Sequence, residues 1–67
     1  MLKQPETGSR FVVGEFHPYF AGMHGFIVGP LDAEDMVVKI DPNSIYEDGI
    51  ETIIGRCWLE EESHEQH

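Results

Sequence analysis

Residues 14–40, GEFHPYFAGMHGFIVGPLDAEDMVVKI, contain the pattern around which the rest of the chain is organised. Residues 26–28 and 36–40 are short apolar runs, and each is followed by a proline that interrupts regular structure, Pro30 and Pro42. Runs of this length with such boundaries are typical of β-strands. The segment therefore predicts a strand, an aromatic loop, a strand, an acidic turn and a strand, in that order.

The chain on the N-terminal side of this segment predicts one strand, over residues 10–16. In that strand Phe11 and Val13 are expected to face inward, because alternate residues of a strand point to the same side, and a bulge at Gly14 would turn Phe16 to that side as well. Residues 1–9 are polar and contain a proline, so they predict a flexible N-terminal arm.

The C-terminal third fits two patterns. A helix over residues 48–60 would bring its apolar residues onto one face: Ile50, Ile53, Ile54, Cys57 and Trp58. A strand over residues 51–57, followed by a tight turn at 58–60, suits the β-branched isoleucines better, and Gly55 would be costly inside a helix. The strand is the favoured prediction, with Cys57 as a small core residue. Residues 63–67 predict a polar tail.

Together these elements predict one mainly β domain over residues 10–62. The expected architecture is a small, strongly bent antiparallel sheet or an SH3-like barrel of four to five short strands, because glycines fall where such a sheet must bend. The alternative is an α+β domain with the C-terminal helix at 48–60.

Four segments carry a family resemblance. They are Gly8-x-x-Phe11-Val12-Val13, Phe20-x-Gly22-x-x-Gly25-x-Ile27-Val28, Met36-Val37-Val38-Lys39-Ile40-Asp41 and Trp58-Leu59-Glu60-Glu61. This layout resembles the small SH3-like barrels, which include KOW-type domains and short accessory subunits of photosynthetic and redox complexes. The resemblance implies a small barrel with no catalytic residue. KOW domains that bind RNA tend to be basic, and this acidic chain departs from them, so nucleic-acid binding is not implied.

Charge is the most extreme property of the composition. The 67 residues include 13 acidic and 4 basic side chains, for a formal net charge of −9. Such a surface repels nucleic-acid phosphates and attracts a basic protein partner. A single cysteine indicates a reducing compartment, and no apolar run approaches the ~20 residues of a membrane helix. The expected setting is the cytoplasm, with no membrane and no direct nucleic-acid partner.

The sequence contains no constellation typical of catalysis or of cofactor binding. His64 and His67 form an H-x-x-H pair in the tail, which is a weak metal signal by itself. Cys57 has no base beside it, and the paired acidic residues have no cleft in a domain of this size. We therefore expect no enzyme activity and no cofactor.

The aromatic loop at 17–24 is the candidate binding site, because it holds more large apolar groups than a surface connection needs. Tyr19, His17 and Met23 are the favoured contacts, whereas Phe20 fits equally well as a plug of the barrel end. The complete set of candidate partner-binding residues adds the acidic turn: His17, Tyr19, Phe20, Met23, His24, Asp32, Glu34 and Asp35.

Two functions fit this surface. The first is a non-enzymatic, small acidic protein-binding module that docks on a larger protein or complex as an accessory subunit, adaptor or inhibitor. The second is an acidic decoy that mimics nucleic-acid phosphates and blocks a nucleic-acid-binding protein, as small phage-encoded inhibitors do. Carboxylates in one regular row would favour the decoy, and carboxylates scattered around an apolar loop would favour docking.

Overall fold

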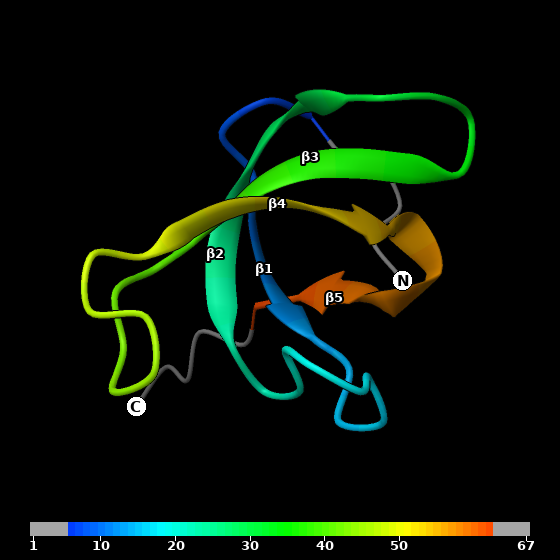
Figure 1. The fold of residues 1–67 in the computed structure, drawn as a ribbon. Helices are drawn as coiled ribbons and strands as arrows, with labels where there is room; N and C mark the ends of the chain where they lie inside the picture. The colour runs from blue at the N-terminus through cyan, green and yellow to red at the C-terminus, as the bar shows by residue number, and fades with distance from the viewer. Residues whose placement is uncertain (1–5, 63–67) are drawn as a thin grey trace, which may run out of the picture.

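The computed structural model describes residues 6–62 and contains five β-strands and one short 3₁₀ turn (Figure 1). The elements are β1 (Arg10–Val13), β2 (His24–Pro30), β3 (Asp35–Ile40), β4 (Ile50–Gly55), η1 (Arg56–Trp58) and β5 (Leu59–Glu61). The prediction of a mainly β fold with four to five short strands is confirmed. The predicted tail with His64 and His67, and residues 1–5 of the predicted arm, lie outside the described residues.

All strands belong to one antiparallel sheet with the order β4-β3-β2-β1-β5. The first four strands follow one another as neighbours, and β5 then returns to pair with β1, as Figure 1 shows. The register of β2 against β3 shifts between Ile27 and Gly29, which is a bulge that bends the sheet. The strongly curved sheet is not closed, and its shape is compatible with a small barrel-like fold. Among residues 6–62, no helix has the length and apolar character needed to cross a membrane.

The core lies on the concave side of the sheet and follows from strict alternation along the strands. In β3, Met36, Val38 and Ile40 are buried, as the sequence pattern predicts. The other four strands all contribute to the same cluster, whose remaining members are Phe11, Val13, Ile27, Ile54 and Leu59. Each strand therefore buries one face, and burial of these side chains is the main favourable term in folding.

The C-terminal third is β4, η1 and β5, so the helix considered over residues 48–60 is wrong. Ile54 is buried and Ile53 is exposed, which is the alternation of a strand that pairs on β3. The predicted turn at 58–60 is also wrong, because Leu59 begins β5 and is fully buried. Cys57 lies in η1 and is exposed instead of being a core residue, since the 3₁₀ turn directs it away from the sheet.

The first strand is shorter than the predicted 10–16. It ends at Val13, and the Gly14 N–H donates to the carbonyl of Trp58 at 2.8 Å as the chain turns away from β2. Phe16 consequently lies in a loop with 88% of its surface exposed, and its predicted inward orientation is wrong. Before the strand, the Gly8 N–H donates to the carbonyl of Ile27 at 2.7 Å, which attaches this part of the chain to β2.

Candidate functional site

The β1–β2 loop, residues 14–23, is held in shape by His17. The backbone N–H groups of Tyr19 and Phe20 both donate to Nδ1 of the His17 imidazole, at 3.1 Å each. This geometry requires that Nδ1 carry no proton, because an acceptor nitrogen needs its lone pair. The His17 side chain is therefore a local cap for the turn, and it fixes the direction in which Tyr19 leaves the loop.

Rings from three separate segments meet at this end of the molecule. The His17 ring lies 5.0 Å from the indole of Trp58 in η1, nearly perpendicular to it, and 5.5 Å from the ring of Phe20. Phe20 in turn contacts Tyr46 of the β3–β4 loop, with ring centres 5.8 Å apart. Edge-to-face and tilted ring contacts of this kind add stability beyond simple burial. They fix the β1–β2 loop against two neighbouring segments.

The predicted contact residues of this loop differ in how much of each side chain is exposed. Tyr19 is 75% exposed, whereas Phe20 and Met23 are half-buried and pack against the core. Phe16 joins Tyr19 on the surface, and Ile45 of the β3–β4 loop is 68% exposed. We call the group Phe16, Tyr19, Ile45, His17, Phe20, Tyr46 and Trp58 the aromatic end.

Carboxylates flank the aromatic end. Glu15 lies in the β1–β2 loop, Glu47 and Asp48 follow Tyr46 in the chain, and all three are exposed. The Glu60 carboxylate lies against the loop, with one oxygen 3.3 Å from the position that a side chain at Gly14 would take. The surface is apolar and surrounded by negative charge, a combination suited to a partner that offers an apolar group beside basic ones.

The acidic turn, residues 31–35, lies beside η1, because the Arg56 N–H donates to the carbonyl of Glu34. Asp32 shapes this turn by accepting the backbone N–H groups of Glu34 and Asp35 at 2.8 and 2.9 Å. The turn follows β2 and the β1–β2 loop precedes it, so the two loops lie at opposite ends of this seven-residue strand (Figure 1). One Asp35 carboxylate oxygen and the Trp58 indole both lie 3.5 Å from the position that a Cβ atom at Gly55 would take, so the turn approaches the aromatic end through η1. Arg56 lies beneath the turn, with its guanidinium donating to the carbonyl of Ala33 at 3.3 Å.

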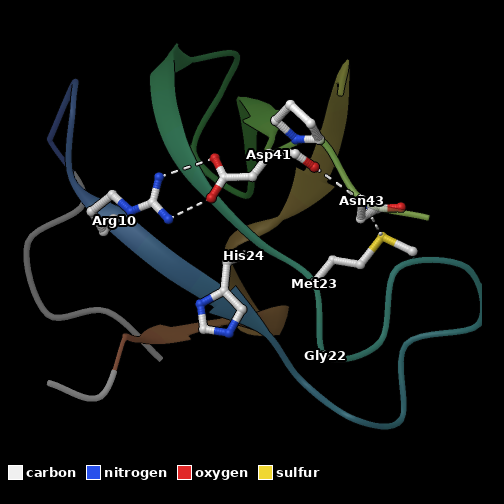
Figure 2. Close-up of a pocket in the computed structure, with 7 residues that line it drawn as sticks. Arg10, Gly22, Met23, His24, Asp41 and Asn43 are labelled. Carbon is white, nitrogen blue, oxygen red and sulfur yellow. Dashed lines mark hydrogen bonds and ion pairs between the residues drawn. The ribbon is translucent and has the colours of Figure 1, made fainter. Parts of the chain in front are cut away.

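A shallow hollow beside the aromatic end is lined by a charged network (Figure 2). Figure 2 shows the guanidinium of Arg10 directed at the carboxylate of Asp41, to which it donates two hydrogen bonds. Arg10 also donates to Glu62, and the imidazole Nδ1 of His24 lies 2.7 Å from a Glu62 oxygen. Met23 and Asn43 form the other wall, with the Asn43 amide 3.6 Å from the Met23 sulfur. The His24 ring is thus held within hydrogen-bond distance of Glu62 at the edge of the hollow.

Hydrogen bonds determine the proton affinities in this network. The Arg10 guanidinium, followed by His24, lowers the pKa of Glu62 to about 2, and Arg10 also holds the pKa of Asp41 below its usual range. The pKa of Arg10 is raised by the same two carboxylates. Because two carboxylates already neutralise Arg10, the hollow does not offer a free positive charge to an anion. Its evident role is to link the end of β5 to β1, β2 and the residue after β3.

The network predicts a specific acid sensitivity, which Glu62→Gln tests. The pKa of Glu62 lies below its ordinary 4.5, so its carboxylate stabilises the fold fully above pH 4.5 and loses that effect as the pH falls to about 2. We expect Glu62→Gln to lower the melting temperature near neutral pH, and the difference from the parent protein to shrink toward about pH 2. Thermal unfolding followed by circular dichroism at several pH values measures both.

Glu61→Gln is the matched control for this experiment. Glu61 is adjacent in the chain and exposed, and it forms no ion pair with any residue in 6–62. Its neutralisation should leave the melting temperature nearly unchanged. Equal losses from the two variants, or a Glu62→Gln loss that is the same at every pH, would contradict the assigned role of the network.

Sequence reasoning missed four members of the aromatic end: Phe16, Ile45, Tyr46 and Trp58. Tyr46 carried the same signal as Tyr19, an aromatic residue within a polar turn, but nothing local showed that the two turns lie at one end of the sheet. Among the described residues, no group of three or more histidine, cysteine or acidic side chains is arranged to hold a metal ion.

Comparison with known proteins adds no further assignment, since no family model, no curated protein and no solved structure matches this chain. Function is therefore inferred from the chemistry of the surface itself.

Proposed function

We propose that this protein is a small, non-enzymatic binding module that docks on a larger protein through its aromatic end. The observation that carries the proposal is the exposure of Phe16 and Tyr19 in the β1–β2 loop and of Ile45 in the β3–β4 loop, two loops that the Phe20–Tyr46 ring contact brings together. Tyrosine and phenylalanine are enriched in the cores of protein interfaces, where they act as anchors. The module would serve as an accessory subunit, an adaptor or an inhibitor.

The flanking carboxylates support a partner with a basic surface. Glu15, Glu47, Asp48 and Glu60 lie around the aromatic end, and the net charge of the chain is −9. Exposed charges of one sign raise the rate of encounter with an oppositely charged protein and contribute less to the final affinity. We therefore propose that the carboxylates mainly set the association rate constant and that the aromatic anchors mainly set the dissociation rate constant.

The strand order supports the finer fold assignment that accompanies this function. A four-strand meander, a 3₁₀ turn and a last strand that returns to the first are the arrangement of the SH3-like barrels that the sequence resembles. The exposed single cysteine fits a reducing compartment, and we propose a cytoplasmic setting.

The placement of the carboxylates favours docking over the phosphate-mimic alternative. Asp32 and Glu34 lie at one end of β3, and Glu47 and Asp48 lie in the loop at its other end. Glu60 and Glu61 lie on β5, at the far edge of the sheet from β4. A scatter of this kind around an apolar surface is the arrangement expected of a docking module.

Tyr19→Ala tests the proposal through the kinetics of the complex. Once a partner is isolated by affinity capture, we expect this variant to dissociate about 30-fold faster, since truncating a buried anchor costs ~2 kcal/mol or more. The slope of affinity against salt concentration should hardly change. Neutralising Glu47 and Asp48 should do the reverse, slowing association and flattening the salt dependence. Surface plasmon resonance at several salt concentrations separates the two effects.

Leu31→Ala is the matched control, because Leu31 is a similarly exposed apolar residue, 52% exposed, in the turn at the other end of β2. It should leave both rates unchanged. If Tyr19→Ala had no effect while removal of charge abolished binding, the docking proposal would be abandoned for the phosphate mimic.

A further inference from the structure

β4 is an outer strand of the open sheet, and half of its backbone groups have no partner in the sheet. β3 pairs with one side of β4, and within residues 6–62 no strand pairs with the other. The Arg56 N–H donates to the Glu34 carbonyl at 2.8 Å, so residues 34 and 56 form a hydrogen-bonded pair. The register of β3 against β4 continues this pattern, which makes Met36 and Ile54 the next hydrogen-bonded pair. Hydrogen-bonded pairs alternate along an antiparallel ladder, so the N–H and C=O groups of Glu51, Ile53 and Gly55 point outward from the sheet.

The two outer strands of this sheet differ in how well they are protected against pairing with another chain. β5 is three residues long and carries Glu60 and Glu61, and short acidic strands discourage edge pairing. β4 is six residues long, contains no proline, and has Glu51 as its one charged residue. Glu51 lies opposite Lys39 of β3 in the register, so its charge is partly offset.

Apolar side chains accompany the free edge of β4. Ile53 is 53% exposed and lies opposite Val37 in the register, on the convex face of the sheet. Val37 and Ile53 also line a shallow hollow together with Glu51 and Thr52. An exposed β-branched residue beside unpaired backbone groups is the usual composition of a strand that adds to another strand.

We propose that the edge of β4 pairs with β4 of a second copy of this chain, antiparallel and with Ile53 opposite Ile53. In this register Glu51 lies opposite Gly55, so no two carboxylates face each other, and the outward N–H and C=O groups of each strand meet those of the other. A register centred on Glu51 would oppose two carboxylates. The interface is isologous, as a two-fold dimer requires.

The charge distribution fits this antiparallel arrangement. Pairing two β4 strands in opposite directions brings Glu47 and Asp48, which precede one strand, toward the end of the other strand, where Arg56 follows. At long range, two copies that each carry a net charge of −9 repel one another. Salt screens this repulsion over ~10 Å at 0.1 M, so dimerisation strengthens as salt is added. Docking on a basic partner has the opposite salt dependence.

The interface is small, since it consists of one edge strand and the side chains beside it. It lies below the ~1,200 Å² of a stable specific interface, so the dimer is weak and concentration-dependent. The aromatic end consists of residues from the β1–β2 loop, the β3–β4 loop and η1, and it contains no residue of β4, so this inference is independent of the proposed docking function.

Analytical ultracentrifugation of the full chain over a wide concentration range, at low and high salt, tests the proposal. We expect the average mass to rise toward that of two chains with concentration, and more so at high salt. Ile53→Lys should weaken association about tenfold or more, through loss of the apolar cross-strand pair and the introduction of like charges. Val28→Lys is the matched control, because Val28 is an exposed residue of β2, away from the edge, and it should leave association unchanged.

A second variant tests the backbone directly. Ile53→Pro removes the backbone N–H of residue 53, which points outward, and leaves the hydrogen bonds between β4 and β3 intact. The monomer should therefore keep its circular dichroism spectrum but no longer associate. A protein that stays monomeric at high concentration and high salt overturns the proposal. Association that survives both Ile53 variants overturns it, and so does association that is lost in Tyr19→Ala, which would place the contact at the aromatic end.

Discussion

Gly25→Ala is expected to lower the free energy of unfolding by about 3 kcal/mol or more, which is a large part of the stability of a domain of this size. Gly25 is buried in β2, between Phe11 of β1 and Ile40 of β3 in the register. A Cβ atom at this position would lie 2.2 Å from the backbone carbonyl oxygen of Lys39 and 3.0 Å from the Phe11 ring. Neither neighbour can yield easily, because one is backbone and the other is a core side chain.

Gly29→Ala is the matched control, four positions further along the same strand. Nothing lies within 4 Å of the position that its Cβ would take, so the added methyl group meets open space. We expect a change within about 0.5 kcal/mol, as for surface substitutions. Chemical denaturation with urea measures both variants. Similar losses at the two positions would mean that β2 is not sandwiched between β1 and β3 in this register.

Leu59→Ala is expected to lower the free energy of unfolding by about 2–5 kcal/mol. Leu59 is the first residue of β5, has no exposed surface, and belongs to the core cluster. Leu59 pairs with Val13 of β1, so its burial helps to hold β5 against β1. Truncation removes buried methyl groups and leaves a cavity in a core that has few side chains to fill it.

Leu31→Ala again provides the comparison, because it removes the same atoms from a half-exposed leucine in a turn. Its loss should be well under that of Leu59→Ala, and the same urea titration gives both values. A silent Leu59→Ala would show that the chain from residue 59 is a surface turn, as the sequence pattern alone suggests, and that the sheet ends at β1.

The local pattern of the sequence was sufficient to identify the central strands. Residues 36–40 alternate apolar and polar side chains, and their alternate members are buried in β3, because the two faces of a strand are set by sequence order alone. The β-branched residues around Ile53 likewise favoured a strand, and Gly55 counted against the alternative helix. Charge also follows from composition, and with it the expectation of a basic partner.

Tertiary structure decided which strand ends are covered and which loops meet. Phe16 is exposed because β1 ends at Val13, and Leu59 is buried because β5 returns to β1, neither of which is encoded in a local alternation. The two halves of the predicted contact surface lie at opposite ends of β2, while Tyr46 and Trp58 join His17 and Phe20 from distant positions in the chain. The physical reason is that the two-residue periodicity of side chains fixes the two faces of each strand locally. Which strands and loops lie next to one another depends instead on the order in which the strands pair, and that order is set by burial of the shared core.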